Sequence, residues 1–376
     1  MQRRISAVAF FLTMNGALLS AQPRWTVDPK PILDIKGVND AGAIVFGTAN
    51  WATRMANGTI VIADGATPAV QFIDGTGKPI KSAGRSGQGP GDFRALTWIA
   101  QCAKDTVFAW DFAQMRITTY DAAGMMLRTF PFGVPGGPQF QSSCNTSGMM
   151  ALFGSPRRVP PSTPPDPNAG YAIMSMAATA MIIGPKGDTM AKLGEIPLVD
   201  YIGSGRGGGA MPRPLGPATA VAVGTNRVYV SRGDSSAIAV YALDGKRTGS
   251  IPLRVPDRTP TAAQYARAAE VILAMAPAAS RERARVPVMA APIPSKLPLV
   301  TGLFIDPAGL VWALLSSPGD SDTRLRAFRA DGTAVADATL PVNLNVFEIG
   351  ADYILGSHSD VDDETHVVVY RLRRGR

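Results

Sequence analysis

Residues 59–93 read TIVIADGATPAVQFIDGTGKPIKSAGRSGQGPGDF, and this stretch decides the fold. It contains three short apolar runs, at 60–63, 69–73 and 79–83, and each run is closed by Asp or Gly. Short β-rich runs at regular spacing, separated by Gly, Asp and Pro, are typical of an all-β meander. The stretch therefore predicts one small antiparallel sheet.

A glycine-rich exit follows the third run and leads to Phe93. We expect Gly87, Gly89 and Gly91 to take positive φ angles, because a chain that leaves the outer strand of one sheet must turn sharply to begin the next. Phe93 is then expected to fill the space between neighbouring sheets. This is the arrangement of a blade and its connector in a β-propeller.

The end of the third run recurs along the chain, which indicates a repeat. Six positions align: Ile73-Asp74, Tyr120-Asp121, Ile183-Gly184, Tyr241-Ala242, Phe328-Arg329 and Tyr370-Arg371. The last unit lacks an outer strand of its own, and the N-terminal run at 31–35 is available to supply it. That pairing would close the ring and leave no exposed sheet edge. The predicted fold is an all-β, six-bladed β-propeller in which the N-terminal strand closes the last blade.

Several of these segments resemble a known family, the secreted bacterial six-bladed β-propellers of the NHL-like type. The resemblance lies in IVIAD at 60–64, VQFID at 70–74 and GRSGQGPGDF at 84–93. Further along, IDPAGLVW at 305–312 and IGADYILG at 349–356 are similar to the fifth and sixth blades. The resemblance implies a single propeller domain over 22–376. Because this architecture serves lyases, lactonases and binding modules alike, it implies no one activity.

The first 21 residues have the parts of a secretory signal peptide. Arg3 and Arg4 precede an apolar run at 5–19, and Ala21 is a small residue before a polar start. The run is too short for a membrane span, which needs about 20 apolar residues. We therefore expect cleavage after Ala21, a periplasmic or secreted protein, and no membrane span.

Charge argues against a nucleic-acid partner. Removing the two arginines of the signal peptide lowers the formal net charge from +8 to +6, and the remaining Lys and Arg residues are scattered along the chain. The exception is a basic C-terminal tail. It consists of Arg371, Arg373, Arg374 and Arg376. We expect this tail to be solvated surface, and the alternative is contact with an anionic envelope surface.

Three segments interrupt the repeat: 154–170, 203–217 and 258–298. The first two are rich in Pro or Gly and are expected to be surface loops without regular structure. The third contains a helix predicted over 261–276, since Thr261 and Gln264 form a capping box and Pro277 stops the run. This helix is either a structural brace or a lid over the central opening.

The two cysteines occupy the same register in adjacent units. Cys102 lies three residues before Asp105, and Cys144 lies three residues before Ser147, each at the first turn of its unit. An exported protein with two such cysteines is expected to join them in a structural disulfide. The alternative is a pair of free buried thiols.

Groups capable of metal chemistry are few. His358 and His366 both fall in the last unit, near Asp360, Asp362, Asp363 and Glu364. This acidic cluster could bind Ca²⁺ through oxygen ligands, but it lacks the spacing and the central Gly of a dedicated calcium loop. A zinc or iron site in a propeller channel needs ligands from several blades, so we expect this segment to be a solvated hairpin turn. The three tryptophans near predicted strands are expected to be core. These are Trp98, Trp110 and Trp312.

Two functions remain open. The first is a non-catalytic recognition or scaffold module, a monomer without cofactor, metal or catalytic residues, that binds a protein, peptide or glycan at its loop-bearing face. The second is a lactonase-like hydrolase or lyase with a carboxylate-held divalent metal in the central funnel. Across the predicted innermost strands, only Glu348 is acidic, which favours recognition. Those strands are expected at 49–55, 96–101, 139–143, 218–223, 300–305 and 346–349.

Overall fold

The computed structural model describes most of the chain downstream of the predicted signal peptide. The described ranges are 24–38, 43, 45–134, 142–160, 168–204, 210–233, 235–254, 259–274, 276–315, 323–341, 343–360 and 364–375. The predicted signal peptide, its cleavage after Ala21, and Arg376 lie outside the described residues.

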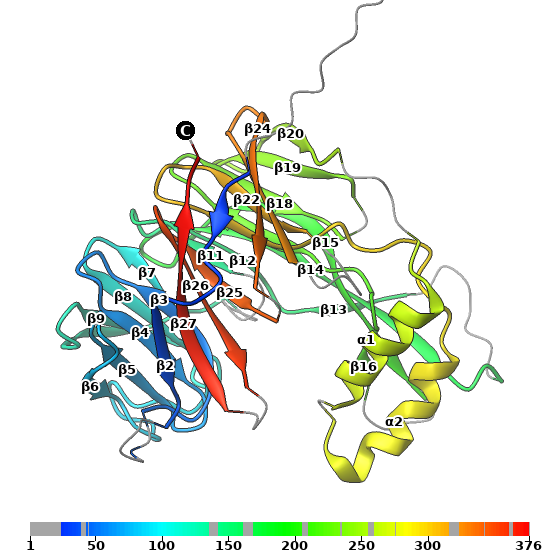
Figure 1. Cartoon of the computed structure of the whole chain (residues 1–376), viewed down its shortest axis with the longest axis horizontal. Coiled ribbons are helices and arrows are strands. Elements are labelled where there is room, and N and C mark those ends of the chain that lie inside the picture. Colours follow the sequence, from blue (N-terminus) through cyan, green and yellow to red (C-terminus); the bar gives the residue numbers. More distant parts are fainter. Residues whose placement is uncertain are drawn as a thin grey trace, which may run out of the picture.

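The described strands form six antiparallel sheets, numbered here in chain order (Figure 1). Sheet 1 consists of β3 (Ala49–Arg54), β4 (Ile60–Asp64), β5 (Ala69–Ile73) and β6 (Pro79–Ala83). Sheet 2 consists of β7 (Leu96–Ala103), β8 (Thr106–Asp111), β9 (Arg116–Asp121) and β10 (Met126–Pro131). Sheet 3 consists of β11 (Ser143–Cys144), β12 (Met150–Phe153), β13 (Arg157–Val159), β14 (Ala172–Ile183), β15 (Thr189–Gly203) and β16 (Met211–Pro212).

The second half of the chain repeats this pattern. Sheet 4 consists of β17 (Ala220–Val223), β18 (Arg227–Ser231), β19 (Ala237–Ala242) and β20 (Arg247–Pro252). Sheet 5 consists of β21 (Val300–Ile305), β22 (Val311–Leu315), β23 (Thr323–Phe328) and β24 (Ala334–Leu340). Sheet 6 consists of β25 (Asn345–Ile349), β26 (Tyr353–Ser359) and β27 (Thr365–Arg373), joined by β1 (Thr26–Val27) and β2 (Leu33–Lys36). The prediction of an all-β fold is confirmed.

The N-terminal run does join the last sheet. Strand β2 pairs antiparallel with β27, so that Leu33 lies opposite Val369 and Ile35 lies opposite Val367. Strand β1 pairs with the end of the same strand. Figure 1 shows β2, the N-terminal blue strand, beside the red strands of the C-terminus.

The core lies between neighbouring sheets. Hydrophobic clusters occupy the interface of each sheet with the next, and one further cluster joins sheet 6 to sheet 1. The middle strands are therefore covered on both faces, and every residue of β4 is buried, whereas the outer strand β6 is mostly exposed. The first strands contact one another in chain order, and β25 contacts β3.

The connector after sheet 1 has the predicted plug. Phe93 is fully buried in the cluster between sheets 1 and 2. The glycines differ from the prediction, since Gly84 and Gly91 take positive φ angles of 81° and 78° while Gly87 and Gly89 do not. A Cβ atom at Gly87 would lie 2.5 Å from the Asp92 carboxylate. Glycine is therefore needed at this position because a side chain would clash with Asp92, and not because of the φ angle.

The inserted segment 258–298 holds two helices, where the sequence predicted one. Helix α1 (Ala262–Ala274) begins at the predicted capping box, in which Thr261 Oγ1 accepts a hydrogen bond from the Gln264 backbone N at 3.2 Å. Helix α2 (Ala278–Ala290) follows directly and contains Pro287. The prediction missed α2 because proline residues signal helix ends.

The helical pair packs against the far end of the long β14–β15 hairpin. Ile202 of β15 forms a small buried cluster with Ala269, Leu273 and Val288 from the helices. Figure 1 shows α1 and α2 beside β16, at the end of this hairpin. None of the helices in the described ranges is long and apolar enough to cross a membrane.

The two predicted surface loops contain short strands, which corrects the prediction. Strand β13 lies within 154–170 and pairs with β14, so that Arg157 is opposite Ala177. Strand β16 lies within 203–217 and pairs with β15, so that Met211 is opposite Ile202. Both segments widen sheet 3 because β14 and β15 are long enough to offer free edges.

Candidate functional site

A cavity of about 900 Å³ lies at the centre of the six sheets. Its walls are the first strands of the sheets and the turns that follow them, and every sheet contributes. The predicted innermost strands at 49–55, 96–101, 300–305 and 346–349 all line it, as do Ser143 of β11 and Val223 of β17. Residues 139–141 of the third predicted strand lie outside the described residues.

The first strands are bent where they face the cavity. The pairing register shifts after the first pair in β3, β7 and β21, and after the second pair in β25, between Val346 and Glu348. Such a β-bulge re-aims the following side chain. In β25 it places Glu348 in the cavity wall.

Glu348 is the polar centre of the wall formed by sheets 6 and 1. Its carboxylate accepts hydrogen bonds from Thr53 Oγ1 at 2.5 Å, from the Arg54 backbone N at 3.3 Å, and from the Tyr353 hydroxyl. Burial raises the pKa of Glu348 above its ordinary value, although the three hydrogen bonds and the Arg54 charge act to lower it. Part of the side chain still faces the cavity. Glu348 is therefore a deep carboxyl group that holds its proton more tightly than a solvated one.

Tyr353 and Arg54 complete this wall. The Arg54 guanidinium lies over the Tyr353 ring, with Cζ 4.5 Å from the ring centroid. Burial raises the pKa of Tyr353, so its hydroxyl remains a hydrogen-bond donor. Beside them, the Trp51 and Phe347 rings lie 5.6 Å apart. This wall therefore offers aromatic surface next to a carboxyl group and a cation.

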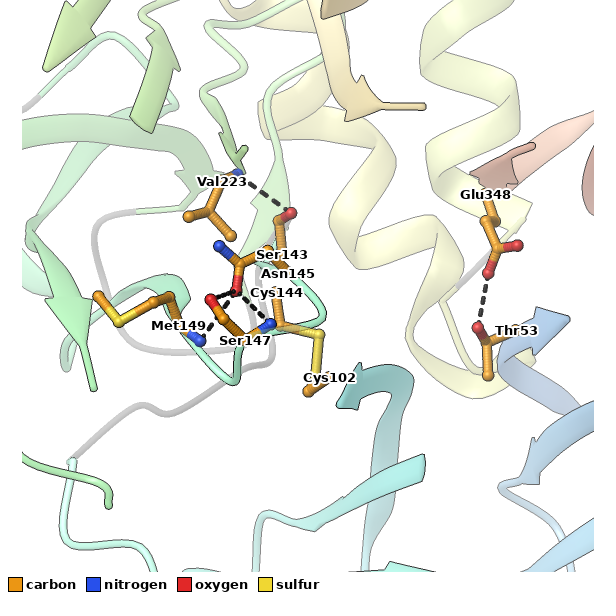
Figure 2. Close-up of a disulfide and its surroundings, with 9 residues drawn as sticks. All are labelled: Thr53, Cys102, Ser143, Cys144, Asn145, Ser147, Met149, Val223 and Glu348. Atoms are coloured by element: carbon orange, nitrogen blue, oxygen red, sulfur yellow. Dashed lines mark hydrogen bonds between the residues drawn. A yellow bond between two sulfur atoms is a disulfide. The ribbon is translucent and has the colours of Figure 1, made fainter. Parts of the chain in front are cut away.

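The opposite wall contains the predicted disulfide (Figure 2). Cys102 of β7 and Cys144 of β11 are bonded, with 5.3 Å between their Cα atoms. Cys102 is fully buried, whereas Cys144 lines the cavity. The structure therefore contains the bond rather than the alternative pair of free thiols.

The turn after Cys144 joins sheet 3 to sheet 4. Asn145 Oδ1 accepts hydrogen bonds from the backbone N atoms of Ser147 and Met149, both at 3.1 Å, while its Nδ2 donates to the Gly224 carbonyl at 2.8 Å. Figure 2 shows Asn145 beside the disulfide, with Glu348 and Thr53 on the other side of the view. This wall is polar and fixed by side-chain hydrogen bonds.

The basic C-terminal tail is not simply solvated surface, which corrects the prediction. Arg374 Nη2 lies 2.7 Å from Oδ2 of Asp306, whose side chain is fully buried, and the Arg374 guanidinium lies over the rings of Trp25 and Trp312. Arg373 forms an ion pair with Asp28, with 2.6 Å between Nε and Oδ1. Although Asp306 lines the cavity, its charge is therefore already matched by Arg374.

Charges at the cavity are few and mixed. Besides Arg54 and Glu348, the lining includes Lys104, Asp105 and Asp352, which are exposed turn residues. Across the described ranges, one group of three potential metal ligands converges, and it lies outside this cavity. It contains His366 of β27, which is buried, whereas Asp360 and Glu364 are half-buried; residues 361–363 of the predicted solvated turn lie outside the described residues.

The sequence also predicts the buried tryptophans and a helix in the inserted segment. The three tryptophans are each at most 2% exposed, as expected for core residues, and Trp98 also lines the cavity. Helices α1 and α2 pack on the β14–β15 hairpin, as a brace would, and in the described ranges neither contributes a residue to the lining of this cavity. Glu348 is the one acidic residue that the sequence predicts in the innermost strands, whereas no signal in the sequence predicts the roles of Arg54 and Tyr353.

No protein-family model matches the chain, and no curated protein matches it. Among solved structures, a member of the DUF4221 family from Bacteroides vulgatus has 9% sequence identity and a TM-score of 0.48, over 94% of this chain and 100% of that one. A streptogramin B lyase has 9% identity and a TM-score of 0.42, over 91% and 87%. Virginiamycin B lyase from Staphylococcus aureus has 10% identity and a TM-score of 0.39, over 91% and 98%. The function is therefore inferred from the chain's own residues.

Proposed function

We propose that this protein is an exported, six-bladed β-propeller that binds a neutral glycan in its central cavity without transforming it. The fold is a single domain over 22–376, of the NHL-like type, closed by the N-terminal strand. The contact of β25 with β3 and the cluster between sheets 6 and 1 support the closure. The signal peptide, cleaved after Ala21, delivers a monomer to the periplasm or the medium.

The observation that carries the proposal is the cavity of about 900 Å³. Ligand pockets commonly occupy about 300–1,000 Å³ and combine apolar walls with a few fixed polar groups. Here the aromatic rings of Trp51 and Phe347 lie beside Glu348, Arg54 and Tyr353. The half-buried Trp51 ring can provide a face for sugar stacking, with the buried Phe347 ring behind it, and the polar groups can meet hydroxyl groups.

The charge of the cavity supports a neutral ligand. Cations and carboxylates at its wall are mixed in sign, and Asp306 is matched by Arg374. Glu348 has a raised pKa and is held by three donors, so it is poorly suited to attract a strong cation. A ligand rich in hydroxyl groups can both donate to Glu348 and accept from Arg54. These features support recognition in the cavity rather than on the loop-bearing face.

One observation favours catalysis as a second candidate. A buried carboxyl group with a raised pKa, bonded to a tyrosine hydroxyl in a cavity, has the properties of a general acid or base. In a lyase or hydrolase, Glu348 would transfer the proton and Tyr353 would orient it.

A binding and turnover experiment tests both candidates. The mature protein is titrated calorimetrically with neutral oligosaccharides, and each mixture is then examined for products by mass spectrometry. We expect binding without products, and weaker binding by at least 10-fold in Glu348→Gln. Asp331→Asn, which changes an exposed turn carboxylate outside the cavity, serves as the matched control and should bind normally.

The outcomes separate the candidates. Products that vanish in Glu348→Gln would establish the catalytic function instead. Binding that is equal in the wild type and Glu348→Gln, or no binding by the wild type, would overturn recognition in the cavity. Light scattering on the same samples tests the monomer.

A further inference from the structure

We propose that Asp360, Glu364 and His366 form a binding site for a divalent transition-metal ion, of which Zn²⁺ fits the donor set best. The site lies at the end of the β26–β27 hairpin in sheet 6, next to the N-terminal strand β2. It is separate from the central cavity, so it is independent of the glycan-binding proposal.

The three side chains converge. One carboxylate oxygen from each acid and one ring nitrogen of His366 all lie within 4.8 Å of one another. His366 Nε2 lies 3.4 Å from Asp360 Oδ2. Two ligand atoms at about 2.1 Å from a tetrahedral Zn²⁺ are separated by roughly 3.4 Å. The pair is therefore already spaced as two corners of a zinc site.

His366 provides the observation that points to a ligand. The residue is 7% exposed, and its buried Nε2 has no hydrogen-bond partner. An unpartnered polar atom in this environment is unfavourable unless something binds it. A metal ion held between Nε2 and the two carboxylates would satisfy it.

Asp34 sets the orientation of the ring. Its Oδ1 lies 2.7 Å from His366 Nδ1, so in the neutral imidazole Nδ1 is the nitrogen that donates to Asp34 and Nε2 is the nitrogen with the lone pair. Metal-bound histidines usually donate their second ring nitrogen to a carboxylate in this way, which fixes the tautomer and raises the basicity of the ligand. Asp34 belongs to β2, more than three hundred residues away in sequence.

The carboxylates are also held in place by the backbone. Asp360 Oδ1 accepts a hydrogen bond from the Glu364 N at 2.9 Å, and Glu364 Oε1 accepts one from the Val38 N at 2.7 Å. Imidazole and carboxylate donors together suit Zn²⁺ better than Ca²⁺, which takes six to eight oxygen ligands. The ion would connect the C-terminal hairpin to the segment that begins with β2, so its role is structural.

The test is calorimetric titration of the untagged mature protein with Zn²⁺ after removal of metals by a chelator. We expect one equivalent to bind the wild type, and binding to be lost in His366→Gln. His358→Gln is the matched control, because it removes the only other histidine of the chain and should leave the affinity within about threefold. Asp34→Asn should weaken binding by about 10- to 100-fold, the usual effect of changing a carboxylate behind a ligating histidine.

A second measurement does not depend on any variant folding. Co²⁺ added to the metal-free wild type should give the visible absorption of a four-coordinate ion, and Zn²⁺ should displace it. The proposal is overturned if the wild type binds neither ion, if His366→Gln binds Zn²⁺ normally, or if His358→Gln abolishes binding. A thermal unfolding curve for each variant shows whether a loss of metal binding comes from removal of a metal-binding side chain or from unfolding of the protein.

Discussion

Replacing both cysteines with alanine should lower the thermal stability by a defined amount. Cys102 and Cys144 are 42 residues apart. On the chain-entropy model, closing a loop of this length stabilises the folded state by about 4 kcal/mol. The entropy of unfolding is about 2.1 cal/mol/K per residue, or roughly 0.8 kcal/mol/K for this chain, so we expect the melting temperature to fall by about 5 °C.

The location of the bond adds a second expectation. Strand β11 is only two residues long, and the disulfide ties it to β7 beside the cavity. Without the bond, β11 retains two paired positions with β12, so the cavity wall should loosen and ligand binding should weaken. The wild type, in which the disulfide ties β11 to β7, is the reference for both the melting temperature and the ligand affinity.

The assay is differential scanning calorimetry of the exported wild type and the double alanine variant at the same pH. Thiol labelling under denaturing conditions first establishes that the wild type has no free cysteine. A decrease in melting temperature below about 1 °C would refute the reasoning, because the bond would then place no useful restraint on the unfolded chain.

Three further variants probe other parts of the molecule. Burial raises the pKa of Glu348 above 4.5, so the stability contributed by its protonated carboxyl group is fullest below pH 4.5 and is lost as the pH rises. In urea unfolding, Glu348→Gln should therefore lose less stability than the wild type between pH 4.5 and 8. Parallel curves of stability against pH would contradict this. Arg374→Met removes the ion-pair partner of the buried Asp306 carboxylate, which keeps its hydrogen bonds from the Ala308 N, the Leu310 N and the Trp312 Nε1. The free energy of unfolding should fall by about 1.5–3 kcal/mol in the same assay, and a change under about 0.5 kcal/mol would show that the pair is unimportant. Tyr265→Phe removes the hydrogen bond to the Val288 carbonyl and should lower the free energy of unfolding by about 1–3 kcal/mol. Amide exchange in α1 and α2 should become faster, while ligand binding in the cavity should not change. Weaker ligand binding would mean that the helices contribute to the cavity.

The strands of the fold could be predicted because their signals are local. The run at 60–63 and the observed β4 differ by one residue, and the predicted run at 69–73 coincides with β5. Alternation of apolar runs with turns is a property of neighbouring residues, and the turn is Asp-Gly in three of the sheets, at 74–75, 244–245 and 331–332. The innermost strands could be located for the same reason.

The errors occurred where tertiary contacts override local signals. Pro287 lies inside α2 and is buried, and its neighbour Val288 packs in the cluster with α1, so a proline does not end the helical structure of this segment. Strand β13 forms in a proline-rich segment because the long β14 offers it an edge. Propensity is only a weak prior where packing decides.

The polar centre of the cavity depends on contacts that sequence spacing cannot reveal. Thr53 and Glu348 are 295 residues apart, and they meet because sheets 1 and 6 are neighbours. The same holds for His366, whose partner Asp34 comes from the opposite end of the chain. Counting acidic residues in the innermost strands found Glu348 but not the tyrosine and arginine that give it its properties.

The junction between the first and last sheets connects the site to the stability of the whole chain. Glu348 comes from sheet 6 and its donors Thr53 and Arg54 from sheet 1, while β2 adds the N-terminal segment to the same sheet 6. A ligand that contacts both sides of this junction binds only when the two sheets are in contact. Such a ligand must stabilise the junction by mass action, so protection from amide exchange should extend from the cavity to β27 and β2. We therefore expect binding in the cavity to be linked to the contact between sheets 6 and 1.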